Sequence, residues 1–176
     1  HCYGEVAHGT QTLKEAFANS CNTAYAYMGE LISDADYQMA AEQLGFGKSW
    51  ENTLSFSESS FELSEETADA VRVQASFGQG ETLVTPFHKL LLGAAIANGG
   101  MLQLPYLVAE GQNCDGEVLW CYGSGGKQEL MNAETAELLK DYMVAASVDK
   151  MQEFADGGIT VAGKTGSAET AEGTHS

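Results

Sequence analysis

An almost entirely apolar segment, residues 87–97, limits the fold of this chain more than any other feature. Thr85 and Pro86 precede it, and a threonine N-cap followed by proline at the first helical position is typical of a helix start. Residues 98–100, Asn-Gly-Gly, follow it and are typical of a helix end. We therefore expect a buried central helix over this segment.

Length and composition favour a single domain. The chain has 176 residues, of which 44% are hydrophobic, enough to bury one sizeable core. Only two prolines are present and low-complexity tracts are lacking, which argues against a disordered linker. We find no signal peptide and no apolar run long enough to span a membrane, so a soluble chain is expected.

The charge balance disfavours two classes of partner. There are 25 acidic residues against 8 basic ones, giving a formal net charge of −17. Nucleic acids and anionic lipid surfaces need clustered lysine and arginine. We expect no nucleic-acid partner and no electrostatic binding to membranes.

The four cysteines show no CxxC motif and no Cys/His spacing that resembles a zinc site. We expect neither a metal nor a cofactor. Cys114 and Cys121 flank a turn signal at residues 115–116, so a disulfide between them is possible. A two-residue hairpin there would not place them opposite each other. The pairing state of the cysteines stays open.

Further helix signals lie on both sides of this region. Thr12 and Glu15 predict a capping box for a short helix that ends near Ser20. Asn22 is a candidate N-cap of a second helix, in which apolar residues recur at helical spacing (Ala24, Tyr27, Met28, Leu31). Ser33 can cap a third helix over residues 34–44. That helix should end at Gly45, followed by Phe46 and Gly47.

The remaining chain is expected to alternate between loops, a hairpin and one more helix. Residues 48–66 predict a long surface loop, and residues 106–122 a hairpin. Asn132 should start an amphipathic helix with Leu138, Leu139 and Met143 on its inner face. Residues 158–163 are β-rich and predict a strand that leads into Lys164.

Two short motifs carry chemistry, Ser20-Cys21-Asn22 and residues 164–167, Lys-Thr-Gly-Ser. Acyl transfer by a serine needs a nucleophile, a proton acceptor and donors for the oxyanion. Ser20 can relay a proton and the Asn22 amide can hold a substrate amide. Lys164 supplies positive charge. As a plain structural alternative, Ser20 and Asn22 could cap helices.

The second motif offers further donors at its end. Thr165 adds a hydroxyl, Gly166 permits close approach of a substrate to the backbone, and the backbone N–H of Ser167 can point at an oxyanion.

S-x-N and K-T-G are two of the three motifs of penicillin-binding proteins and serine β-lactamases. Three stretches, HGTQTLKEAFANSCNTAYAYMGE, ASFGQGETLVTPFHKLLLGAAIANGG and VAGKTGSAET, also resemble the transpeptidase domain of class B penicillin-binding proteins, in the same order. The resemblance covers nearly the whole chain. It implies an α+β fold like that of serine β-lactamases and penicillin-binding proteins, here mostly helical with part of an antiparallel sheet.

The resemblance also implies a function. Such a protein is a D,D-transpeptidase that cross-links peptidoglycan stem peptides through a serine acyl-enzyme and is acylated by β-lactam antibiotics. The catalytic positions would be Ser20, Lys164 and Ser167, and the substrate-binding positions Asn22, Thr165 and Gly166. Cys21 would have no role. Further partners would be cell-wall synthesis proteins. The location would be the extracytoplasmic face of the bacterial cell membrane, through an N-terminal anchor outside this chain.

The third motif, S-x-x-K with the nucleophile, should precede Ser20 but does not occur there. Residues 124–127 and 147–150 match it formally, the first in a glycine-rich turn and the second near a helix end, and both follow S-x-N. We therefore expect residues 1–176 to be a partial transpeptidase domain that lacks its nucleophile and the strands after K-T-G, and that is inactive alone. The alternatives are a non-catalytic β-lactam sensor and a degenerate binding or interaction module.

Overall fold

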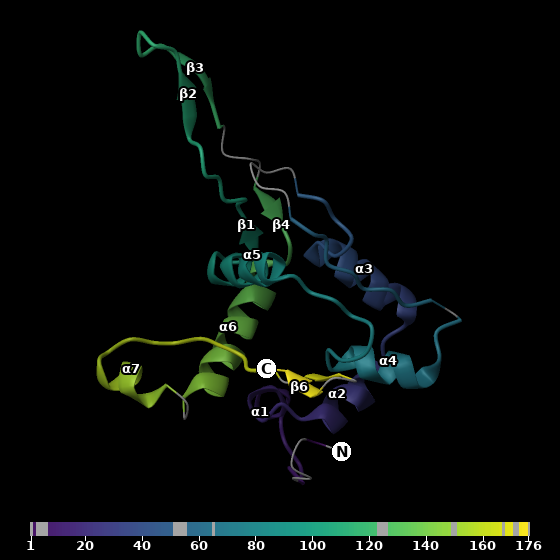
Figure 1. The fold of residues 1–176 in the computed structure, drawn as a ribbon. Helices are drawn as coiled ribbons and strands as arrows, with labels where there is room; N and C mark the ends of the chain where they lie inside the picture. The colour runs from purple at the N-terminus through teal and green to yellow at the C-terminus, as the bar shows by residue number, and fades with distance from the viewer. Residues whose placement is uncertain are drawn as a thin grey trace. The chain divides into compact units, whose positions relative to one another are not determined.

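The structure is a computed structural model that describes residues 2, 7–50, 56–64, 66–122, 127–148, 151–166, 168–170 and 173–175. Helices dominate it, and the strands form three small antiparallel pairs (Figure 1). The helices are α1 (Leu13–Ala18), α2 (Asn22–Gly29), α3 (Asp34–Leu44), α4 (Asp69–Ser76), α5 (Pro86–Ala97), α6 (Ala133–Ser147) and α7 (Gln152–Asp156). The strands are β1 (Met101–Leu102), β2 (Glu110–Gln112), β3 (Val118–Cys121), β4 (Gln128–Glu129), β5 (Ala168–Thr170) and β6 (Gly173–His175).

The chain divides into two compact units. The first unit comprises His1–Met39, Glu62–Thr82 and Glu137–Ser176, and the second comprises Ala40–Phe61 and Leu83–Ala136. In neither unit do the described residues include a helix that is long and apolar enough to cross a membrane.

The first unit begins with the predicted capping box. The Thr12 side chain accepts a hydrogen bond from the Glu15 N–H, and the Glu15 carboxylate accepts from the Thr12 N–H at 2.7 Å, which confirms the start of α1. The prediction for α2 is wrong by one residue. Cys21 occupies the N-cap position, because its carbonyl accepts from the N–H groups of Ala24 and Tyr25, and Asn22 is the first helical residue.

Helix α2 packs against α4, a helix that the sequence patterns did not predict. A Cβ atom at Gly29 would lie 2.4 Å from the Ser76 Cβ, so this glycine allows the close approach. An ion pair of 2.8 Å between Arg72 and Asp34 joins α4 to the start of α3. The predicted limits of α3 are confirmed, since Ser33 accepts from the Asp36 N–H and Gly45 has a positive φ of 99°.

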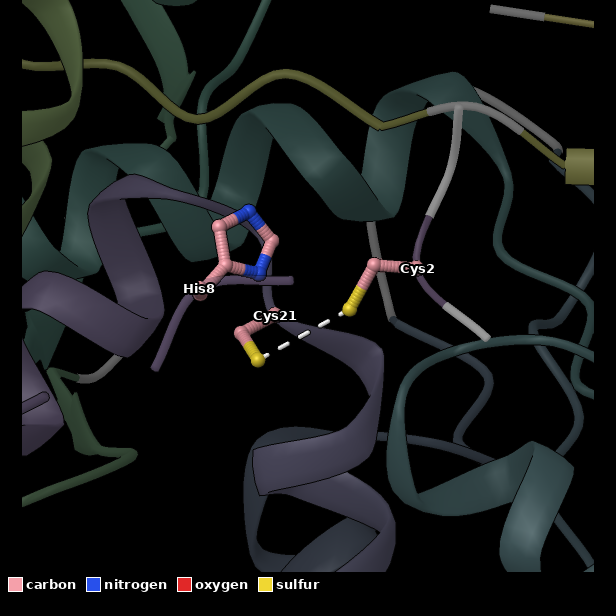
Figure 2. Close-up of side chains that lie close together, drawn as sticks. All are labelled: Cys2, His8 and Cys21. Carbon is pink, nitrogen blue, oxygen red and sulfur yellow. Dashed lines mark hydrogen bonds between the residues drawn. The ribbon is translucent and has the colours of Figure 1, made fainter. Parts of the chain in front are cut away.

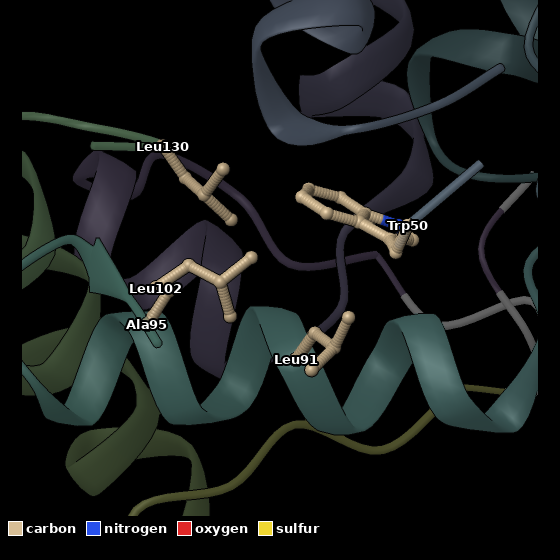
Figure 3. Close-up of a cluster of buried hydrophobic side chains, with 5 residues drawn as sticks. All are labelled: Trp50, Leu91, Ala95, Leu102 and Leu130. Atoms are coloured by element: carbon tan, nitrogen blue, oxygen red, sulfur yellow. The ribbon is translucent and has the colours of Figure 1, made fainter. Parts of the chain in front are cut away.

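The core of the second unit is a small cluster of buried apolar side chains (Figure 3): Trp50, Leu91, Ala95, Leu102 and Leu130. Trp50 corrects the expectation of a surface loop over residues 48–66. The part of this segment that the structure describes does lack helices and strands, but the Trp50 indole is buried and Phe56 packs against the cluster. An indole buries a large apolar area, which outweighs the polar character of its neighbours.

Helix α5 starts as predicted, with the Thr85 side chain accepting from the His88 N–H. The expectation of a buried central helix holds for one face of α5 only. His88, Leu91 and Ala95 are buried along one face, whereas Leu90 is 62% exposed. The His88 ring lies 2.9 Å from the Leu44 carbonyl through Nε2, which gives one of its two ring nitrogens a partner on the buried face.

Strand β1 follows α5 and pairs with β4, and β2 pairs with β3 in the predicted hairpin. Gly116 turns the hairpin with a positive φ of 82°. Cys121 lies opposite Glu110, and Cys114 and Cys121 are exposed free thiols, so the possible disulfide is not formed in this structure.

Asn132 caps α6 as predicted, since its side-chain oxygen accepts from the Thr135 N–H at 2.7 Å. Leu138 was expected on the inner face and is instead 49% exposed, while Leu139 and Met143 are half-buried. The strand predicted before Lys164 is also wrong. Residues 159–166 have no strand partner among the described residues, because the N–H of Gly163 donates to the Met143 carbonyl of α6 instead.

Candidate active site

Ser20 lies in the tight turn between α1 and α2. Its φ is +51°, in the left-handed region that non-glycine residues seldom adopt. Two backbone hydrogen bonds hold this turn, from the Ser20 N–H to the Phe17 carbonyl at 3.1 Å and from the Cys21 N–H to the Ala16 carbonyl at 2.9 Å. The turn thus presents the Ser20 side chain to solvent. Strained backbone of this kind is common where a side chain is presented for function.

Lys164 comes from the far end of the same unit and contacts Ser20 directly. Its Nζ donates a hydrogen bond to the Ser20 Oγ, and it lies 2.6 Å from the Thr165 carbonyl. The same ammonium lies 5.8 Å from the centre of the Phe17 ring, within the range of cation–π attraction. The structure therefore brings the serine of S-x-N and the lysine of K-T-G together.

Helix α6 positions the segment before Lys164. The N–H of Gly163 donates to the Met143 carbonyl at 3.1 Å, and the Ser147 hydroxyl lies 2.9 Å from the same carbonyl and 3.3 Å from that of Gly163. Helix α6 also supplies Tyr142, whose ring centre lies 5.8 Å from that of Phe17. Phe17 and Tyr142 were not predicted as site residues, because nothing in their spacing distinguishes them from core aromatics.

The other predicted site residues are placed as follows. Asn22 begins α2, half-buried, and no hydrogen bond of its side chain occurs within the described ranges. Thr165 and Gly166 are exposed, and a Cβ atom at Gly166 would meet no atom of the described residues within 4 Å. The space beside this backbone is open to an approaching ligand. Ser167 lies outside the described residues.

Of the serines in the two formal S-x-x-K matches, Ser147 is among the described residues. Ser124 and Lys150 lie outside the described residues. Ser147 is 6% exposed, and its hydroxyl is occupied by the backbone carbonyls described above. A buried, bonded hydroxyl cannot reach a substrate carbonyl. This agrees with the expectation that Ser147 is not a nucleophile.

The electrostatics of the site favour anions. Lys164 is the charged group at its centre, and an ammonium beside a serine hydroxyl can bind a carboxylate or favour loss of a hydroxyl proton. The open backbone at Gly166 can lie against an extended peptide. The arrangement suits recognition of a peptide-like substrate with a free carboxylate, and proton relay near the bond that reacts.

Residues 2–176 match the family described as Penicillin binding protein transpeptidase domain. The chain belongs to this family. Peptidoglycan D,D-transpeptidase PbpA of Mycolicibacterium smegmatis is 30% identical to it over 161 residues, which are 91% of this chain and 32% of that protein. Stage V sporulation protein D of Bacillus subtilis is 27% identical over 172 residues, 96% of this chain and 26% of its own length.

Solved structures of penicillin-binding proteins share the fold. The crystal structure of PBPA from Mycobacterium tuberculosis superposes with a TM-score of 0.81 at 28% identity, covering 93% of this chain and 39% of that one. Penicillin-binding protein A from the same organism in its penicillin G acyl-enzyme complex gives 0.81 at 28% identity, over 96% of this chain and 38% of that one. The predicted fold class is confirmed. The chain spans about a third of the length of the PbpA relatives it matches.

Proposed function

We propose that this chain contributes the S-x-N and K-T-G motifs to a D,D-transpeptidase active site. The observation that carries the proposal is the hydrogen bond from Lys164 Nζ to Ser20 Oγ, which joins motifs separated by 144 positions. Two unrelated surface residues would not be expected to meet in this way. The matched family and the PbpA relatives, named as peptidoglycan D,D-transpeptidases, agree with it.

Each site residue has a proposed role in the acyl transfer. Ser20 and Lys164 relay the proton that leaves the attacking serine and returns to the leaving group. The Asn22 amide holds a backbone amide of the substrate, and Thr165 binds its carboxylate together with Lys164. The N–H of Ser167 stabilises the oxyanion, with Gly166 leaving room for the peptide.

We further propose that residues 1–176 form part of a larger transpeptidase domain, and that the attacking serine is not among them. Ser147 is buried with its hydroxyl bonded to backbone carbonyls, and the relatives are about three times as long as the matched segment. The substrates would be peptidoglycan stem peptides, with β-lactams as acylating inhibitors. The larger protein would act outside the bacterial cell membrane, held by an anchor and in contact with other cell-wall synthesis proteins.

The experiment has two arms that read covalent acylation by intact mass. The 176-residue chain is incubated with benzylpenicillin, as is a chimera in which it replaces the matching segment of M. smegmatis PbpA. We expect no adduct on the isolated chain and one adduct per chimera. An adduct on the isolated chain would place a nucleophile within these residues and overturn that part of the proposal.

The chimera also separates the enzyme from a β-lactam sensor. A transpeptidase should pass the acyl group of a thioester or stem-peptide substrate to an amine acceptor, whereas a sensor would keep the penicilloyl group and transfer nothing. A folded chimera that forms no adduct would contradict the proposed roles of both motifs. The unmodified PbpA serves as the positive control in each assay.

A further inference from the structure

A second cluster of reactive side chains lies beside the S-x-N turn. Cys2, His8 and Cys21 come together there, and their potential ligand atoms all lie within 4.8 Å of one another (Figure 2). The close-up shows the His8 ring next to the two sulfur atoms, with one ring nitrogen toward them. Cys2 and His8 are six residues apart, and His8 and Cys21 are thirteen apart. These intervals do not resemble a zinc motif, so the sequence predicted no metal site.

We propose that Cys2, His8 and Cys21 bind a soft divalent cation, for which Zn²⁺ is the appropriate probe. Thiolates and imidazole are the ligands that zinc prefers in proteins. On binding, the two thiols release their protons to solvent, and two metal–sulfur bonds and one metal–nitrogen bond form. Three side chains supply ligands among the described residues, and a tetrahedral zinc site takes a fourth ligand.

The separation of the sulfur atoms supports a metal. They lie 3.7 Å apart. Two zinc–sulfur bonds of about 2.3 Å at a tetrahedral angle place their sulfurs about 3.8 Å apart, whereas a disulfide requires a sulfur–sulfur bond of about 2.05 Å. The thiols are therefore spaced for a shared cation without further movement toward each other.

Burial of the two thiols and of one His8 ring nitrogen supports the same conclusion. Cys2 is 8% exposed and Cys21 is 3% exposed. The Nδ1 atom of His8 is buried and has no hydrogen-bond partner within the part of the chain that the structure describes. A buried polar atom without a partner is costly, and a bound cation would satisfy it.

Thr23 supports the sulfur atoms from outside the cluster. Its hydroxyl lies 3.4 Å from the Cys2 Sγ and 3.3 Å from the Cys21 Sγ. A hydroxyl that donates to a ligand sulfur fixes its orientation, as outer hydrogen-bond partners do in known metal sites. All four residues belong to the first unit.

A cation here would act on the start of α2. Cys21 occupies the N-cap position between Ser20 and Asn22, so binding would fix the S-x-N turn against the segment that contains Cys2. The inference does not depend on acyl transfer. Its test needs no enzyme activity.

The test titrates the reduced 176-residue chain with Zn²⁺ against a chromophoric chelator. We expect one tightly bound Zn²⁺ per chain. Stoichiometric zinc should also protect Cys2 and Cys21 from alkylation by iodoacetamide and leave Cys114 and Cys121 reactive, as peptide mapping would show. The control variant, Cys114→Ser with Cys121→Ser, removes two exposed thiols and should bind zinc as well as the parent chain.

Substitutions at the site test which side chains bind zinc. Thr23→Val should weaken zinc binding about 10–100-fold, the usual cost of losing an outer partner. Cys21→Ser and His8→Gln should each weaken it further. Equal zinc affinity in Cys21→Ser, or alkylation of Cys2 and Cys21 at the same rate with and without zinc, would overturn the proposal.

Discussion

The Lys164 ammonium donates a hydrogen bond to the hydroxyl of Ser20, which the turn between α1 and α2 presents from 144 positions earlier in the chain. Both side chains are exposed, so the contact contributes little to the stability of the fold. Its value lies in placing a positive charge beside a hydroxyl that can carry a proton. The following predictions test the elements that create this arrangement and the fold around it.

The backbone at Ser20 should be strained. Ser20→Gly and Ser20→Ala both remove the hydroxyl, but only glycine adopts a φ of +51° without cost. We expect Ser20→Gly to be more stable than Ser20→Ala by about 1 kcal/mol in urea unfolding, the penalty for an L-residue in the left-handed region. Equal stability, or a more stable alanine variant, would show that the turn is not left-handed.

Gly100 should tolerate no side chain. Its φ is +87°, and a Cβ atom would lie 2.0 Å from the carbonyl oxygen of Met131. Because a backbone atom cannot move away as a side chain can, Gly100→Ala should destabilise the chain by about 3 kcal/mol. Gly99→Ala is the matched control, since Gly99 has a φ of +64° with no atom within 4 Å of its Cβ position.

We expect the control to lose only about 1 kcal/mol. Urea unfolding followed by circular dichroism measures both variants. If they are destabilised equally, the contact between Gly100 and Met131 is not present in the folded protein.

The capping box should make α1 sensitive to acid. Hydrogen bonds from the backbone N–H and the side chain of Thr12 lower the pKa of Glu15 below its usual value of 4.5. Folding therefore favours the carboxylate. The stability that it contributes is present above the unfolded-state pKa and is lost as the pH falls through the lower, folded-state pKa.

Glu15→Gln should thus lower the free energy of unfolding near neutral pH and have a smaller effect at a pH below the folded-state pKa of Glu15. Urea titrations of both proteins at each pH measure this difference. A penalty that grows on acidification would mean that the carboxylate is not stabilised by Thr12.

Local signals predicted much of this fold because they depend on neighbours in sequence. Thr12 with Glu15, Ser33 with Asp36, and Thr85 with His88 each mark a helix start through hydrogen bonds that span a few residues. Such local patterns do not predict which distant elements pack against each other. Neither the burial of Trp50 nor the exposure of Leu90 could be inferred without knowing which elements pack on them.

In the candidate site, too, local motifs were predicted and long-range contacts were not. Ser20 and Lys164 were identified from short motifs, and the structure brings them into contact. The strand expected before Lys164 was wrong because its backbone bonds to α6, a partner that residue periodicity does not reveal. The cluster of Cys2, His8 and Cys21 was missed because chain folding, and not sequence spacing, assembles it.

The most direct test of the account is the rate of acylation by benzylpenicillin in the PbpA chimera with Lys164→Ala. The control is Lys89→Ala, which removes the same charge from an exposed position on α5. Removing one group that stabilises developing charge typically costs about 100–1,000-fold in rate. We predict a loss of at least about 100-fold for Lys164→Ala and no change for Lys89→Ala, with both variants unfolding like the parent. An acylation rate for Lys164→Ala equal to that of the parent would contradict the placement of Lys164 in the active site.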